Sequence, residues 1–287
     1  MIRKLRQWMK KWSFGISLLL SGIVFFTWTD NWQIYTEPVQ EAYTRGVQTV
    51  QTTETSESAD MAEEPETTAE TEVPEQATTE AAEEPQEIVY HSVDDSYFDD
   101  AVFIGDSRTV GMYEYSGLEE TSTFYASTGL TIYKMFDSAI VSVPGQKKKI
   151  TVEEALSEKQ FAKIYLMIGI NEMGTGTVES FMKTYGEAVQ HLRELQPDAI
   201  IYLQAIMKVT TERSEQGDYI TNEGIAARNE EIAKLADDKT IFYLDVNPYI
   251  CDETGGMVAS YTYDGVHLKA QYIPIWLDFL KEHAIFS

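Results

Sequence analysis

The chain has 287 residues, with 47 acidic side chains against 22 Lys and Arg, and so a formal net charge of −25. This excess argues against nucleic acid as a partner, because a phosphate backbone requires Lys and Arg opposite it. The single cysteine, Cys251, excludes a disulfide within the chain. The length suits one or two domains.

The amino-terminal segment has the charge pattern of a signal anchor. Residues 1–11 carry basic and no acidic side chains, and residues 12–29 carry no charge at all. An apolar span of this length is at the short end for a bilayer of ~30 Å, and the basic flank predicts that the amino terminus is cytoplasmic. Because no small-residue cleavage site follows, we expect residues 1–30 to be an uncleaved anchor, with a cleaved signal peptide as the alternative.

A stalk is predicted between the anchor and the globular part. Residues 48–87 consist mainly of Thr, Glu, Ala, Pro and Ser, and no Lys or Arg occurs between Arg45 and Arg108. Such a segment cannot bury enough apolar surface to offset the entropy of ordering it. We therefore expect residues 31–90 to be a disordered spacer that holds the domain away from the membrane; a filler without contacts of its own is the alternative.

From residue 91 onward the pattern alternates between strands and helices. The expected strands are 102–104, 123–126, 163–168, 199–206 and 241–246. The expected helices are 109–115, 152–156 with Thr151 and Glu154 as a capping box, 178–195, 222–236 capped by Asn222, and 272–284. This alternation predicts a three-layer α/β/α domain with a doubly wound parallel sheet over residues 91–287.

After a sharp exit at Gly105, Ser107 lies at the carboxyl end of the first expected strand, at the sheet edge where open α/β folds bind their ligands. A serine nucleophile needs a base. Asp264 and His267 are three positions apart, so one turn can present both, the carboxylate holding the imidazole and the imidazole taking the serine proton. The structural alternatives are a helix-capping Ser107 and an Asp-Gly turn at Asp264, and we expect Asp106 to be an acceptor at the helix start.

Four segments, in this order, resemble the conserved blocks of the SGNH hydrolases, also called GDSL-type esterases and lipases. They are Gly105–Gly111, a glycine at Gly129, Gly169–Asn171, and Asp264–His267, and the resemblance covers about residues 97–285. It implies a serine esterase whose oxyanion is bound by the backbone N–H groups of Ser107 and Gly129 and by the side chain of Asn171. No clustered metal ligands and no Gly-rich phosphate loop are found, so we expect neither metal nor cofactor.

Three features depart from the family pattern or add to it. Glu172 stands where the family commonly has Asp, and Arg108 places a positive charge beside the nucleophile. Both are provisional substrate-binding residues, although Arg108 could instead pair with an acid. The polar stretch 207–224, which contains Lys208, Arg213 and Tyr219, is expected to border the site and set specificity, unless it is only a solvated loop.

Together these features predict a single-pass membrane protein with an extracytoplasmic serine esterase domain. The expected substrates are ester-linked acyl groups, above all O-acetyl groups on cell-wall or extracellular glycans. An O-acyltransferase of the same fold and a catalytically silent glycan-binding module are the alternatives. The sequence leaves the acyl group, the glycan and the oligomeric state open.

Overall fold

The computed structural model describes residues 88–286. The predicted anchor and almost all of the predicted stalk lie outside these residues. None of the helices between residues 88 and 286 has the length and apolar character needed to cross a bilayer.

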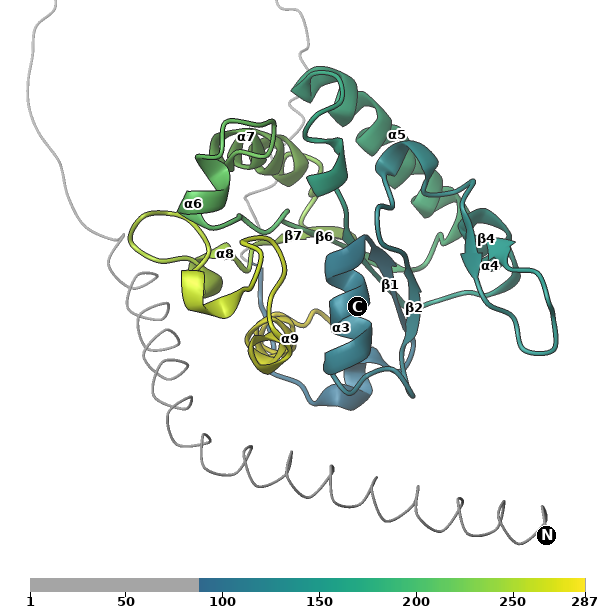
Figure 1. Ribbon diagram of the computed structural model, residues 1–287. Coiled ribbons are helices and arrows are strands. Elements are labelled where there is room, and N and C mark those ends of the chain that lie inside the picture. Colours follow the sequence, from purple (N-terminus) through teal and green to yellow (C-terminus); the bar gives the residue numbers. More distant parts are fainter. Residues whose placement is uncertain (1–87, 287) are drawn as a thin grey trace, which may run out of the picture. The chain divides into compact units, whose positions relative to one another are not determined.

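The main sheet of the described region has five parallel strands in the order β2-β1-β5-β6-β7 (Figure 1). They are β1 (Ala101–Gly105), β2 (Thr123–Ala126), β5 (Lys163–Met167), β6 (Ile200–Gln204) and β7 (Ile241–Leu244). Every residue of β1, β5 and β6 is buried, as expected for strands covered on both faces. The strand order reverses between β1 and β5, where doubly wound sheets form their ligand crevice. The predicted parallel α/β sheet is confirmed.

Helices cover both faces of the sheet (Figure 1). One face carries α4 (Val152–Glu158), α5 (Val178–Leu195) and α7 (Asn222–Ala233), and the other α3 (Ser107–Tyr115) and α9 (Ile273–Glu282). A row of aromatic rings, one from each strand, crosses the sheet beneath α3 and α9, with neighbouring centroids 4.5–6.0 Å apart: Phe124, Phe103, Tyr165, Tyr202 and Phe242. Burying these large rings side by side stabilises the registered strand order.

Most predicted elements are present with ends shifted by a few residues, and the capping box of Thr151 and Glu154 is confirmed. One predicted cap is wrong. Helix α7 is capped by Thr221, whose hydroxyl accepts from Gly224 N. The side-chain amide of Asn222 instead accepts from Val209 N and donates to Val209 O. Two short strands and two short α-helices of the described region have no periodic pattern and were not predicted. These are β3 (Ala139–Val141), β4 (Ile150–Thr151), α6 (Thr211–Ser214) and α8 (Asn247–Ile250).

Candidate active site

A tight strand-to-helix turn places Ser107 at the carboxyl edge of the sheet. Strand β1 ends at Gly105, and Ser107 is the first residue of α3. A Cβ atom on Gly105 would lie 2.1 Å from Thr109 Oγ1 and 2.3 Å from Met167 O, so only glycine allows the helix to begin this close to the strands. Buried Asp106 caps α3 by accepting from Arg108 N at 2.9 Å, which confirms its predicted structural role.

The three residues of the predicted triad form a continuous hydrogen-bonded chain. Ser107 Oγ lies 2.8 Å from His267 Nε2, although the two residues are 160 positions apart. His267 Nδ1 lies 2.7 Å from Asp264 Oδ2. When Nδ1–H donates to the carboxylate, Nε2 is left as the acceptor that faces the serine hydroxyl. This arrangement allows His267 to remove the proton of Ser107.

The turn that carries Asp264 fixes its carboxylate. Asp264 Oδ1 accepts from the backbone N–H groups of Val266 and His267, each at 2.9 Å, and from Thr262 Oγ1 at 3.1 Å. Partial burial opposes ionisation, but the bonds from His267 and Val266 outweigh it and hold the pKa of Asp264 well below its usual range. Asp264 is therefore an anion at neutral pH, ready to stabilise an imidazolium at His267. The Asp-Gly turn expected at Asp264 is thus present, and the same turn carries two residues of the predicted triad.

Asn171 and Gly129 lie on loops that are bonded to each other. Asn171 belongs to a 3₁₀ helix, Ile170–Glu172, that follows β5, and its Nδ2 donates to Leu130 O at 2.9 Å. Gly129, next to Leu130, has φ of 75°. An amide nitrogen carries two hydrogens, so the second one of Asn171 remains for a substrate oxygen. Because β1, β2 and β5 are neighbours, the donors predicted at Ser107, Gly129 and Asn171 follow three adjacent strands.

Glu172 holds the same loop at a second point. Its side chain is fully buried, its Oε1 accepts from Ile132 N at 2.5 Å, and its Oε2 has no hydrogen-bond partner among the described residues. Burial raises the pKa of Glu172 to about 7, against the opposing effect of the Ile132 bond. A carboxyl group in this position does not face a substrate, so the predicted substrate-binding role of Glu172 is replaced by one in holding the 127–132 loop.

Arg108 is also buried, which its charge did not suggest. None of its three guanidinium nitrogens has a hydrogen-bond partner in the described part of the chain. Burial lowers the pKa of Arg108, while the nearby carboxylates of Asp106 and Asp264 favour its charged form. Neither sequence-based alternative fits: the guanidinium is not presented to a substrate, and it forms no hydrogen-bonded pair with an acid. Its charge acts on Asp106 and Asp264 without direct bonding.

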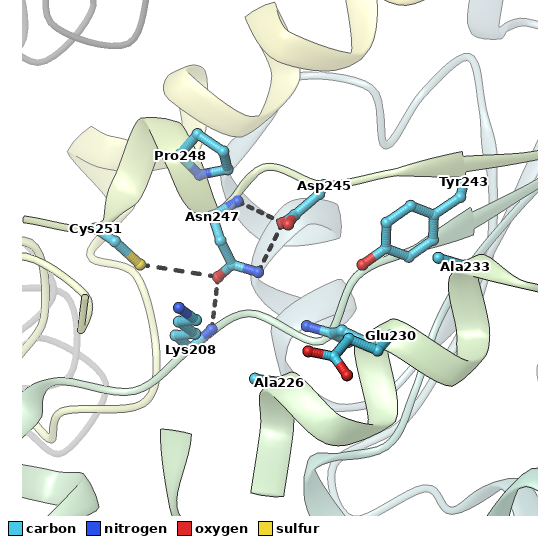
Figure 2. Close-up of a pocket in the computed structure, with 10 residues that line it drawn as sticks. Lys208, Ala226, Glu230, Ala233, Tyr243, Asp245, Asn247, Pro248 and Cys251 are labelled. Atoms are coloured by element: carbon cyan, nitrogen blue, oxygen red, sulfur yellow. Dashed lines mark hydrogen bonds between the residues drawn. The ribbon is translucent and has the colours of Figure 1, made fainter. Parts of the chain in front are cut away.

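A separate cavity of about 410 Å³ lies beyond the carboxyl end of β7, between α7 and α8 (Figure 2). Lys208, Glu230, Tyr243, Asp245 and Cys251 are among its lining residues, and no member of the triad is. Burial raises the pKa of Cys251 to about 12, so its thiol stays protonated at neutral pH. Residues 88–286 contain no group of three or more His, Cys, Asp or Glu side chains that could hold a metal ion.

The polar stretch 207–224 borders the site, as its sequence predicted. Thr210 N donates to Gly265 O at 2.9 Å, in the turn between Asp264 and His267. Farther along, the ring of Tyr219 lies against Gly174, three residues after Asn171. The individual contacts could not be predicted, because they join loops that are distant along the chain.

The GDSL-like lipase/acylhydrolase family matches residues 103–271, more than half of the chain. Among solved structures, a Streptococcus pneumonia protein provisionally described as a platelet activating factor is 23% identical, with 65% of this chain and 87% of that one covered and a TM-score of 0.50. A GDSL-like lipase from Bacteroides thetaiotaomicron is 16% identical, with 64% and 86% covered and a TM-score of 0.49. An acetyl xylan esterase is 18% identical, with 63% and 96% covered and a TM-score of 0.43. No curated protein matches the chain.

Proposed function

Because the chain belongs to the GDSL-like lipase/acylhydrolase family and is a carboxylic ester hydrolase, we propose that Ser107, His267 and Asp264 hydrolyse O-acyl esters, chiefly O-acetyl groups on extracellular or cell-wall glycans. The observation that carries this proposal is the unbroken chain from Ser107 Oγ through His267 to Asp264. The glycan target is supported by the predicted location and by the polar stretch that borders the triad.

The geometry supports acyl transfer in two steps. Ser107 Oγ attacks the ester carbonyl carbon while His267 Nε2 takes its proton, and the carbonyl oxygen becomes an oxyanion that accepts from the N–H groups of Ser107 and Gly129 and from the amide of Asn171. His267 then gives its proton to the departing alcohol oxygen, which leaves an acyl ester on Ser107. Water then attacks this ester while His267 takes one of its protons, and His267 gives that proton to the departing Ser107 Oγ, so that the carboxylic acid and free Ser107 result.

A glycan hydroxyl could replace water in the second step, and the enzyme would then be an O-acyltransferase. Both reactions use the same acyl ester on Ser107, so the fold and the triad suit either one. The assembled triad argues against the third alternative, a catalytically silent binding module, since nothing in pure binding requires Ser107, His267 and Asp264 to be hydrogen-bonded in series.

Incubating the full-length chain, purified in mild detergent, with a neutral acetylated oligosaccharide is expected to release free acetate. An isotope-labelled, unacetylated oligosaccharide is added as acceptor, and mass spectrometry follows acetyl transfer to it. Free acetate in excess over labelled product supports hydrolysis. Labelled product in excess would establish the transferase alternative. If neither the oligosaccharide nor 4-nitrophenyl acetate is turned over, the esterase proposal is wrong.

We also propose that the domain lies outside the cytoplasm, attached by residues 1–30, because a basic flank precedes an uncharged apolar span. Protease added to intact cells is expected to release the domain by cutting within residues 48–87. A surface protein must be digested and a cytoplasmic protein spared in the same sample. Full protection of the domain would contradict this topology, and domain free in the medium before protease is added would indicate a cleaved signal peptide.

A further inference from the structure

Residues 210–221, here called the rim segment, pack against two other loops, the turn of Asp264 and His267 and the loop that follows Asn171. At one end, Gly265 approaches so closely that a Cβ atom on it would lie 2.7 Å from Arg213 Cβ. At the other end, a Cβ atom on Gly174 would lie 2.8–3.0 Å from three ring carbons of Tyr219. Gly265 lies between Asp264 and His267, and Gly174 follows Asn171. The rim segment therefore contacts the turn of Asp264 and His267 at one end, and at the other end Tyr219 packs on the loop that follows Asn171.

The rim segment is fastened on both sides of Tyr219. The guanidinium of Arg213 donates two bonds to the Asp218 carboxylate, at 3.1 and 2.9 Å, and Asp218 Oδ1 also accepts from Ile220 N at 2.8 Å. Asn222 N donates to Ser214 Oγ at 2.8 Å. These bonds fix the backbone around Tyr219, yet 62% of this residue is exposed. A ring held in place by its neighbours and open to solvent loses little further entropy when it binds a ligand.

Two more exposed tyrosines stand on the other loops of the site. Tyr133, 36% exposed, follows the loop of Gly129, and its hydroxyl lies 3.9 Å from the position of a Cβ atom on Gly176. Tyr263, 91% exposed, directly precedes Asp264, and the Lys269 ammonium lies 4.3 Å from its ring centroid. Single exposed aromatic residues are ordinary on protein surfaces. Here Tyr133 follows the loop of Gly129 and Tyr263 precedes Asp264, so each stands beside a residue of the predicted site.

From these contacts we propose that Tyr219 forms a subsite for a neutral sugar ring next to the acylated sugar. This inference rests on the proposed esterase function and specifies its substrate. The side chains around Tyr219 in the rim segment are hydroxyl, amide and charged groups. A pyranose ring matches this setting, because its C–H face packs on an aromatic ring while its hydroxyl groups point outward to polar partners.

The same residues disfavour two other ligands. A long acyl chain requires a continuous apolar surface, whereas Tyr219 is flanked in sequence by Asp218 and by Ile220, which packs inward against the core. The rim segment carries Glu212, Glu215 and Asp218 against a single Arg213, so its charge is negative. A uronic acid or a phosphorylated sugar would be repelled by these carboxylates, and a neutral sugar would not.

The test compares kcat/KM on a neutral acetylated oligosaccharide with kcat/KM on 4-nitrophenyl acetate, which cannot reach the subsite. In Tyr219→Ala, kcat/KM on the oligosaccharide divided by kcat/KM on 4-nitrophenyl acetate is expected to fall about tenfold, because one aromatic stacking contact is lost. The fall is expected in a higher KM for the oligosaccharide and not in a lower kcat. Tyr219→Phe, which keeps the ring, is expected to retain the ratio. Tyr115→Ala is the matched control, because Tyr115 is 52% exposed at the far end of α3, roughly 12 Å along the helix from Ser107.

A direct binding measurement complements the kinetics. In the Ser107→Ala background, calorimetry with an unacetylated neutral oligosaccharide is expected to show about tenfold weaker binding when Tyr219→Ala is added. Equal affinity with and without Tyr219 would overturn the subsite, as would tighter binding of a uronic acid oligomer. If 4-nitrophenyl acetate is hydrolysed but the ratio does not change in Tyr219→Ala, the subsite is wrong and the esterase stands. If neither 4-nitrophenyl acetate nor the acetylated oligosaccharide is hydrolysed, the esterase proposal fails, and the binding result alone decides the subsite.

Discussion

Ser107→Ala is expected to lower the turnover of 4-nitrophenyl acetate by at least ~10³-fold, because the three triad residues act as a unit. The alanine removes the oxygen that forms the acyl ester and leaves His267 Nε2 with no proton to take. His267→Ala is expected to lower turnover by about as much. The variant with both substitutions is expected to be little slower than either single variant. This lack of additivity would distinguish a triad from two residues that contribute independently.

A matched serine outside the site provides the control for this experiment. Ser157 lies exposed on α4, and within residues 88–286 its hydroxyl donates only to a carbonyl of its own helix, so Ser157→Ala is expected to keep full activity. Both serine variants should unfold at the same temperature as the unmodified chain. Comparable rates for the unmodified chain and a folded Ser107→Ala would show that Ser107 is only the first residue of α3 and that the hydrolysis occurs elsewhere.

The parts of the site that could be predicted are those encoded locally. Asp264 and His267 are brought together by a single turn, and Ser107 by the exit from one buried strand. The strands and helices with the clearest boundaries also had strong local signals. Helix α5 has the predicted ends because apolar residues recur at helical spacing, Thr177 caps its start and Pro197 follows its end.

What could not be predicted depends on contacts between distant segments. The bonds of Asn171 to Leu130 and of Glu172 to Ile132 join residues 41 and 40 positions apart, and only the path of the folded loop brings them together. The burial of Arg108 without a hydrogen-bond partner for its guanidinium among the described residues runs against the general rule that charged side chains are rarely buried unpaired, so its sequence position gave no reason to expect it. Thr221 and Asn222 are both good capping residues, so the sequence does not choose between them, and the tertiary contact of Asn222 with Val209 does.

Asn171→Ala is expected to lower kcat by about 10²–10³ with little change in KM, if the amide donates to the oxyanion only in the transition state. The structure adds a complication, because the same side chain donates to Leu130 O and so holds the loop of Gly129. Glu172→Ala separates the two effects, since it removes the other bond to that loop, at Ile132 N, without removing a predicted oxyanion donor. If the donor role is correct, kcat falls at least tenfold further in Asn171→Ala than in Glu172→Ala.

Both variants must first be shown to fold, by an unchanged circular dichroism spectrum and by melting temperatures measured side by side. Equal losses of kcat in the two would mean that Asn171 acts by holding the loop, and the oxyanion would then depend on the N–H groups of Ser107 and Gly129. A folded Asn171→Ala enzyme with full kcat would make Asn171 a turn residue and the third block a chance match. A rise in KM alone would mean that the amide binds the substrate in its ground state, because an interaction that is equally strong in the transition state does not change kcat.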